Sequence, residues 1–331
     1  MNSISKYQFA ALLLITDLFS LCCLRGGVSI VTLWGMLAGT AVQFLGAVCF
    51  AVQGGALKKW VQVFFLAYAV FCGGALFVSL WRTRDAIYIP YEESRGVWGC
   101  LMTAGLIALV CLYASSTGIK SVTRAAVIAA VLALLFLSVD LVSAVFNAEW
   151  RNVSLPQERG FLRELFRGFG LSVSLGSMAV WLDSVRGDKS CAVTVYFAAK
   201  AMAVTAVMLT VLPVVGGIMT LTDFPVITAA QLSQPFEAQR IDSLFLVVFS
   251  VLAVFSVSLQ VMTGAYLLGE LFPRFQRWRS LTVIVLMIGA AFVISQRELT
   301  AVRACAAIAA LFIAPVGAKN PLPLAADRRG P

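Results

Sequence analysis

One carboxylate lies at the centre of an apolar stretch. Residues 8–24, QFAALLLITDLFSLCCL, are long enough to cross a bilayer, and Asp17 is near their midpoint. A charge at that depth costs roughly 2.5–3.5 kcal/mol on insertion scales, so such side chains face protein or water and often serve function. Asp17 is therefore predicted to be a counter-ion for a ligand's ammonium group, or a site of proton or cation coupling. The alternative is a structural carboxylate that accepts hydrogen bonds from Ser or Thr on another helix.

Two further charged residues are candidates for coupling. Asp140, in SVDLVSAVF, lies about five residues outward of the middle of its span, or roughly 7–8 Å at helical rise. It shares a proton pathway with Asp17 or merely reaches the outer interface. Lys200 lies mid-bilayer if its span begins at Ser190, where it pairs with Asp17 or replaces a bound cation. If the span begins at Ala201, the side chain snorkels to the cytoplasmic surface. The apolar run that follows favours snorkelling.

Hydroxyl and glycine residues complete the predicted ligand site. If the helix around Ser174–Ser177 opens, its backbone N–H groups can bind a carboxylate. The alternative is that each hydroxyl makes an ordinary hydrogen bond between helices, and that the small residues serve close helix packing. The candidate ligand-binding residues beside Asp17 are Thr16, Ser20, Ser174, Gly176, Ser177, Ser256 and Ser258. Arg303 is expected to snorkel outward.

Composition makes lipid the solvent for these residues. Of 331 residues, 60% are hydrophobic and 12% charged, and the mean hydropathy is +0.92. The chain has no His, which excludes imidazole metal sites, and its eight Cys lie mostly in apolar spans without CxxC spacing. Basic residues are scattered through short loops, so nucleic acid is not an expected partner. Because no catalytic motif is present, we expect neither an enzyme nor a cofactor or metal site.

The expected fold is an all-α membrane protein of about ten transmembrane helices. Residues 1–318 form the transmembrane domain and 319–331 a cytoplasmic tail; the first span runs into the second, as a signal anchor does. Lys in loops lies wholly on the amino-terminal side, so both termini are predicted to be cytoplasmic. The predicted spans are 8–24, 28–52, 61–81, 97–116, 122–146, 165–182, 193–217, 241–268, 279–295 and 298–317.

Two features of this order point to a central site. Spans 1–5 and 6–10 are candidates for a five-plus-five inverted repeat, because five spans per half invert the topology. Glycine and serine crowd the sixth span, LFRGFGLSVSLGSMAVWL, and weaken its helix. The outward segment 218–240 suits a short helix over the outer mouth, bracketed by Pro225 and Pro235, or else an ordinary interfacial loop.

Residues 224–268, FPVITAAQLSQPFEAQRIDSLFLVVFSVLAVFSVSLQVMTGAYLL, resemble the endospore germination permease family, the membrane-embedded B subunits of germinant receptors. The start ISKYQFAALLLI and the segment SLGSMAVWL are similar to that family more weakly. Phe249 stands where the family commonly has Trp, and the first span has no glycine before Gly26 and no proline. The residues that carry the resemblance are Phe224, Pro225, Gln239, Arg240, Asp242, Ser243, Phe245, Leu246, Val247 and Val248.

The resemblance implies an amino-acid/polyamine/organocation transporter fold with broken helices 1 and 6. It also implies a spore inner-membrane protein that binds a small nutrient such as an amino acid between helices 1, 6 and 8, and that signals through A- and C-type subunits. The alternative is a cation- or proton-coupled secondary transporter of amino acids or amines. A third possibility is a member that has lost its pocket and serves as an assembly scaffold.

Overall fold

The computed structural model describes residues 3–53, 57–87, 97–146, 148–153, 161–218, 222–233, 242–295 and 300–317. Within these ranges the chain forms twelve α-helices, and the only β structure is a bridge between Ile4 and Val185. The predicted tail 319–331 lies outside the described residues, and the division of the chain at residue 318 stays a prediction.

Each predicted span overlaps helix. Five helical stretches are long and apolar enough to cross a membrane by themselves: Ile30–Val52, Lys59–Arg84, Ile119–Val145, Lys189–Val215 and Val247–Leu271. The protein is therefore an integral membrane protein. The helices in chain order are α1 Lys6–Cys22, α2 Ile30–Gln53, α3 Lys59–Ile87, α4 Val97–Thr117, α5 Ile119–Val145, α6 Phe161–Phe169, α7 Leu175–Trp181, α8 Lys189–Val215, α9 Pro225–Ser233, α10 Asp242–Leu271, α11 Arg279–Ser295 and α12 Thr300–Gly317.

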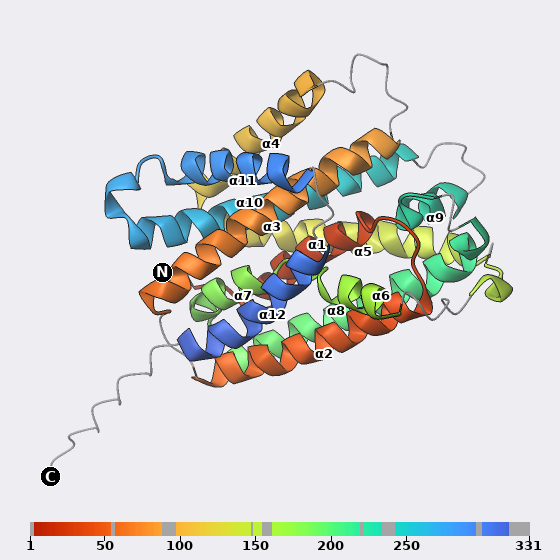
Figure 1. Ribbon diagram of the computed structural model, residues 1–331, viewed down its shortest axis with the longest axis horizontal. Coiled ribbons are helices and arrows are strands. Elements are labelled where there is room, and N and C mark those ends of the chain that lie inside the picture. The colour runs from red at the N-terminus through yellow and green to blue at the C-terminus, as the bar shows by residue number, and fades with distance from the viewer. Residues whose placement is uncertain are drawn as a thin grey trace, which may run out of the picture.

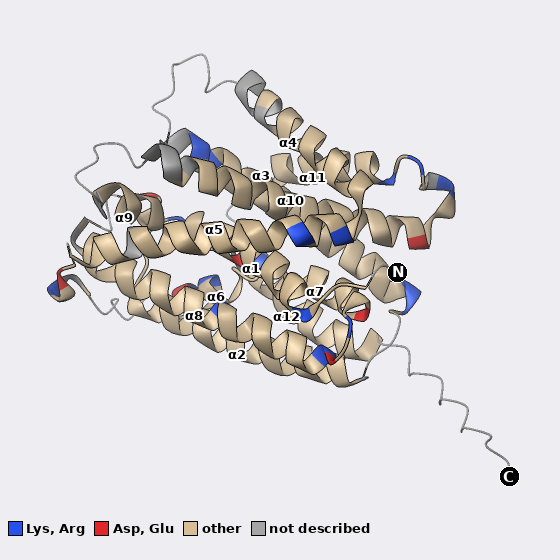
Figure 2. Ribbon diagram, turned by 180° about the vertical axis from the view of Figure 1, so that it is seen from behind, with Lys and Arg blue, Asp and Glu red and all other residues tan. Residues whose placement is uncertain are grey.

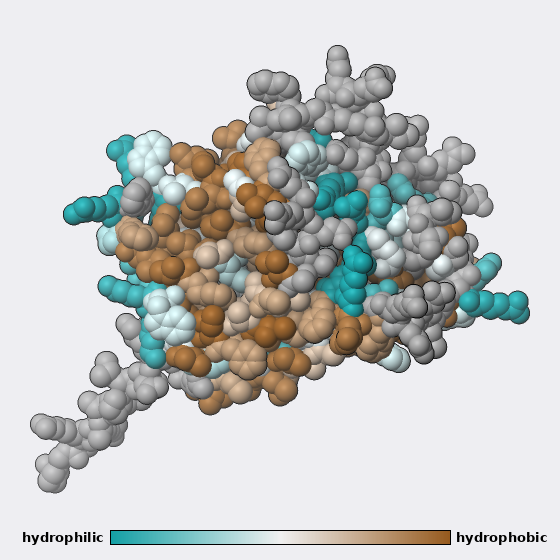
Figure 3. All heavy atoms as spheres, in the orientation of Figure 1, coloured by the Kyte–Doolittle hydropathy of each residue, from teal (hydrophilic) through white to brown (hydrophobic). Residues whose placement is uncertain are grey.

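The long helices run roughly side by side, so their ends gather at two opposite ends of the molecule (Figure 1). Both chain ends lie at the same end: the amide of Ile4 donates to Ser184, and the amide of Lys58 donates to Gly317 at 2.9 Å. Most Lys, Arg, Asp and Glu lie toward the two ends (Figure 2), and an apolar belt covers the surface between them (Figure 3). This arrangement is that of a bundle placed across a bilayer.

α1 is the central helix, and it contacts α5, α8 and α10. Its residues from Leu12 to Cys22 are all buried, because they are apolar on every side except at Thr16, Asp17 and Ser20. Ser5 and Gln8 form a reciprocal capping box at its start. The helix continues through Asp17 without interruption, so the prediction of a broken helix 1 is wrong. TDLFSLCC holds neither glycine nor proline, the residues that would open it.

The sixth predicted span is divided. α6 ends at Phe169, residues 170–174 are not helical, and α7 begins at Leu175. α6 is held close to α2: a Cβ on Gly168 would lie 2.8 Å from the carbonyl oxygen of Thr32, and one on Gly35 would lie 2.6 Å from that of Leu165. Close packing and a helix break, the two explanations for the small residues of this span, are both present.

The short helix predicted within 218–240 is also present. α9 begins at Pro225, whose ring suits the first position of a helix, and ends at Ser233. It contacts α5, α8, α1 and α10. Of the residues that carry the family resemblance, Gln239 and Arg240 lie outside the described part of the chain.

Candidate functional site

Asp17 lies opposite the break between α6 and α7. Its carboxylate is 4% exposed and accepts hydrogen bonds from the Ser174 hydroxyl at 3.2 and 3.3 Å. The hydroxyl of Tyr196, on α8, donates to the same carboxylate and also contacts Ser174. Because the helix is interrupted before Leu175, the Ser174 hydroxyl is directed at Asp17 of α1.

Lys200 completes this cluster. Its ammonium nitrogen lies 3.3 Å from Asp17 Oδ1, and the side chain is 5% exposed. It also donates to the hydroxyl of Ser172, in the non-helical segment, and lies 5.9 Å from the centroid of the Tyr196 ring. α8 begins at Lys189, eleven residues before Lys200, so the expectation that Lys200 snorkels to the surface is wrong. The ion pair joins α1, the α6–α7 break and α8.

The site therefore differs from the one predicted between helices 1, 6 and 8. The predicted third wall, the eighth span, corresponds to α10. In the structure the third wall is instead α8, the seventh span, which supplies Tyr196 and Lys200. Ser256, on α10, donates to the Leu252 carbonyl of its own helix, and Ser258 donates to Cys111 of α4. Neither of these serines lines the cavity beside Asp17. Ser256 and Ser258 of the eighth predicted span therefore do not contact Asp17.

Thr16 and Ser20 do not join the carboxylate either. Thr16 donates to the Leu12 carbonyl at 3.4 Å and Ser20 to the Thr16 carbonyl at 2.9 Å, each four residues back. Such bonds satisfy a buried hydroxyl within one helix. The alternative for Asp17, a carboxylate bonded to Ser of another helix, is realised through Ser174. Asp17 already has Lys200 as its counter-ion, so the predicted pairing with a ligand's ammonium group is not the arrangement found.

Gly176 and Ser177 lie on α7 behind the break. A Cβ on Gly176 would lie 2.5 Å from Cδ1 of Tyr68, so the glycine allows α7 to pack on α3. Ser177 donates to the Gln260 side chain of α10 at 3.2 Å and accepts from Thr263 at 3.0 Å. These two residues serve helix packing. Asp140 lies within α5, but its side chain is outside the described part of the structure.

A small cavity of about 20 Å³ adjoins the pair. Asp17, Ser172 and Lys200 line it together with Thr40 and Gln43 of α2. Gln43 is 1% exposed, and its Oε1 has no hydrogen-bond partner among the described residues. The volume is enough for about one water molecule. Within the described residues, no group of three or more His, Cys, Asp or Glu is placed to hold a metal ion.

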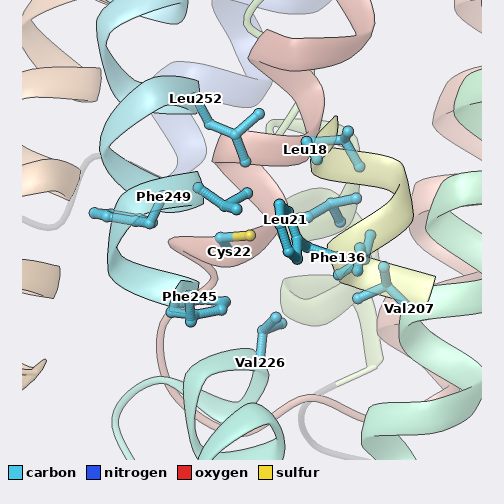
Figure 4. Close-up of a pocket in the computed structure, with 12 residues that line it drawn as sticks. Leu18, Leu21, Cys22, Phe136, Val207, Val226, Phe245, Phe249 and Leu252 are labelled. Carbon is cyan, nitrogen blue, oxygen red and sulfur yellow. The ribbon is translucent and has the colours of Figure 1, made fainter. Parts of the chain in front are cut away.

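A second cavity of about 20 Å³ lies between α1, α5, α8, α9 and α10. Leu18, Leu21, Phe245, Phe249 and Leu252 point into it (Figure 4). Phe249 also packs on Phe19 of α1, with ring centroids 5.1 Å apart. Apolar walls of this kind offer no ligand to an ion, so this second cavity is not a candidate ion site.

Four residues of the site were not predicted: Tyr196, Ser172, Gln43 and Tyr68. Tyr68 donates its hydroxyl to the Ser172 carbonyl at 3.2 Å and so supports the non-helical segment. A signal for Tyr196 exists, because it precedes Lys200 by four residues and the two therefore share a helix face. Nothing in the sequence singles out Gln43 among the polar residues of the second span.

Comparison with known proteins supports the architecture. The sequence matches no protein-family model and no curated protein. Among solved structures, the chain is similar to MHP1, a nucleobase-cation-symport-1 family transporter, in a closed conformation with bromovinylhydantoin bound. The TM-score is 0.59 at 14% identity, over 94% of this chain and 76% of that chain. The fold is that of a membrane transporter. At this identity the likeness concerns the fold alone, and membership of the germination permease family stays a prediction.

Proposed function

We propose that this protein is a secondary transporter that moves a small molecule together with a proton. The observation that carries the proposal is the buried Asp17–Lys200 ion pair at the break between α6 and α7. Ionisable residues at membrane depth mark substrate and proton pathways in pumps and transporters. The likeness to a cation-symport transporter supports the same class of activity.

A proton suits this site better than a metal cation does. The carboxylate of Asp17 already accepts from Ser174 and Tyr196 and pairs with Lys200, so a metal ion would have to displace an ammonium group. A proton instead binds a carboxylate oxygen and removes the negative charge. Lys200 is then a buried cation without its counter-ion, which is unfavourable in a low dielectric. Protonation is thereby linked to a rearrangement of α1, α8 and the non-helical segment.

We infer that the two halves of the chain form the inverted repeat expected from the sequence, with α6 and α7 together matching α1. Contacts between helices support this correspondence. α1 contacts α5, and its counterpart α6 contacts α12. α3 contacts α11, and its counterpart α10 contacts α4. Repeats related in this way allow one half to rock against the other around a site at mid-membrane, which is the basis of alternating access.

The test combines binding with movement. Amino acids and other small metabolites that raise the thermal midpoint of the purified chain are added to proteoliposomes that contain a pH-sensitive dye. We expect at least one of them to acidify the lumen and to accumulate when labelled, driven by an inward proton gradient. The Asp17→Asn variant should lose both signals. Compounds that bind the wild-type chain but never cross the bilayer would refute the transporter.

That contrary result would favour the germinant-receptor role. The short helix α9, which begins at Pro225, and the burial of Phe224 and Phe245 accord with the resemblance over 224–268. In that role the same site binds a nutrient, and the signal passes to A- and C-type subunits. Co-purification with such subunits, and loss of germination when the gene is deleted, would support it.

A further inference from the structure

A much larger cavity of about 570 Å³ lies toward the end of the molecule opposite the two chain ends. The end of α1, the outer part of α3, α6 and the start of α12 form its walls, with Asp223 and Phe224 just before α9. Its volume falls within the range of small-molecule sites. Figure 3 shows hydrophilic residues gathered on this half of the molecule, beyond the apolar belt.

Among the described residues that line this cavity, arginines outnumber carboxylates. Five arginines line it, Arg25, Arg82, Arg163, Arg167 and Arg303, against the carboxylates of Glu164 and Asp223. Glu164 is also engaged by α2: its Oε2 accepts from Thr32 at 3.3 Å and from Ser29. Within the described part of the chain, neither Arg25 nor Arg303 lies within ion-pair distance of a carboxylate. The five arginines come from four separate segments, so the fold gathers them at one place.

Guanidinium groups in such a hollow point to a particular ligand. Arginine is always charged, and its planar fork matches a carboxylate or phosphate through two parallel hydrogen bonds. Arg25 and Arg303 line the cavity without a carboxylate at ion-pair distance in the described part of the chain, so an anion that enters can pair with them. Ala75, Val78, Phe224 and Ile294 make the rest of the wall apolar, which suits a carbon skeleton better than an inorganic anion. A cationic amine would be repelled.

The cavity also leads toward the ion pair. Leu171, in the non-helical segment, lines both this cavity and the small one that holds Asp17 and Lys200. A ligand that passes Leu171 meets the ammonium of Lys200 next. When Asp17 is protonated, that ammonium lacks a counter-ion, and an anionic ligand supplies one.

We propose that this cavity is the outer binding site for a small organic carboxylate, and that this anion is the molecule carried with the proton. Binding at the cavity stands on the arginines and the volume. Its transport rests on the proposed function. The same arginines disfavour the amine substrates considered from the sequence.

The test measures binding rather than transport. The full chain is purified in an uncharged detergent, and dissociation constants are measured by calorimetry for three acids and their amides: L-glutamate and L-glutamine, benzoate and benzamide, hexanoate and hexanamide. At least one acid should bind at least about tenfold more tightly than its amide, because the amide lacks the charge that the guanidiniums recognise. Equal binding of acid and amide, or no binding of any acid, would overturn the proposal.

Variants locate the site. Arg303→Gln and Arg25→Gln should each raise the dissociation constant of the acid at least about tenfold. Arg303→Lys keeps the positive charge and removes only the planar fork of the guanidinium. Arg25 is exposed, so its substitution keeps the fold intact. Arg124→Gln, on the exposed face of α5 at the other end, makes the same change of charge and should leave binding unchanged. An equal loss in Arg124→Gln would contradict a local site.

Two further probes separate the sources of an anion. The thermal midpoint is measured with inorganic phosphate, and in nanodiscs of phosphatidylglycerol compared with phosphatidylcholine. The proposal of an organic carboxylate would be overturned if only phosphate or the anionic lipid raised the midpoint and Arg303→Gln abolished that rise. Binding of an acid that never crosses the proteoliposome membrane would uphold this site and refute the transporter. Transport of an uncharged molecule without any acid binding would do the reverse.

Discussion

At the scale of the residue, the buried Asp17–Lys200 pair is costly to form. Two charges taken out of water lose more hydration than their attraction returns, unless further hydrogen bonds are made. Here those bonds come from Ser174, Tyr196 and Ser172. An apolar pair of similar volume would hold the helices at least as well.

Neutralising one partner should therefore be worse than removing both. Asp17→Asn leaves the ammonium of Lys200 buried and unpaired, and it should lower the free energy of unfolding by about 3–5 kcal/mol. The double variant Asp17→Asn/Lys200→Met should recover most of this loss while remaining inactive. Unfolding in mixed detergent micelles measures both effects.

The matched control is the exposed pair of Lys189 and Asp183, 2.6 Å apart and about one-third exposed on each side. Asp183→Asn should cost about 0–1 kcal/mol. If the double variant at Asp17 and Lys200 is as unstable as the single one, the buried charge is not the cause.

The sequence predicted Asp17 and named Ser174 and Lys200 among the candidates, but it did not predict Tyr196 or Ser172. Asp17 stands out because a lone carboxylate in an apolar run is costly. Hydropathy alone allows two membrane depths for Lys200, because it does not show where α8 begins. Asp188 decides it: its side chain accepts from the amide of Ser190 and caps the helix at that point. Ser172 joins the site only because the sixth span is broken between α6 and α7, and composition does not show which hydroxyl near the break meets α8.

At the scale of the element, the two broken helices implied by family resemblance had different outcomes. Gly168, Gly170 and the serines around them left the sixth span unable to stay helical, and the break is present. The first span lacks such residues and stays whole. Local composition therefore predicted the two outcomes better than the family resemblance did, because glycine and serine lower the free-energy cost of interrupting a helix.

The packing of α7 on α3 offers an element-scale prediction. Gly176→Ala places a methyl group 2.5 Å from the Tyr68 ring, which is overpacked and should cost about 1–3 kcal/mol. Since Tyr68 also holds the Ser172 carbonyl, the substitution should reduce transport as well. The change is measured by unfolding in micelles and by uptake in proteoliposomes.

Gly289→Ala in α11 is the control, because nothing lies within 4 Å of the added Cβ. Alanine favours helix over glycine by up to about 1 kcal/mol, so this variant should be as stable as the wild type or slightly more stable. Equal effects at the two glycines would argue against a tight α7–α3 contact.

At the scale of the whole molecule, apolar length predicted where helices lie, and the alternation of loops predicted that the chain ends share one side. Two contacts accord with this alternation of loops: Ser115, near the end of α4, bonds Ser280 at the start of α11 at 2.7 Å, and Lys58, before α3, bonds the Val316 carbonyl near the end of α12 at 3.2 Å. The large cavity was not predictable. Its arginines are spread over almost the whole sequence, and each resembles an ordinary charge at the end of a span.

The side that faces the cytoplasm is open to a direct test. Because Lys6, Lys58, Lys120 and Lys189 all belong to the end that holds the termini, we expect that end to be cytoplasmic. A green fluorescent protein fused after the last residue should fluoresce in bacteria. Alkaline phosphatase fused after Arg151, at the opposite end, should be active. The reversed pattern would invert the assignment, and with it the entry side of the arginine-lined cavity.

The bridge between Ile4 and Val185 has a mechanical meaning. The Ile4 amide donates to Ser184 at 2.9 Å, and the Arg186 amide donates to Ile4 at 2.8 Å. These bonds clamp the segment before α1 to the segment after α7, so the two helices have a common foot. Neither can tilt at that end without dragging the other or tearing two backbone hydrogen bonds. If α7 cannot tilt at that end, movement of the sixth span is expected at the non-helical residues 170–174. Lys200 donates a hydrogen bond to Ser172 within that segment.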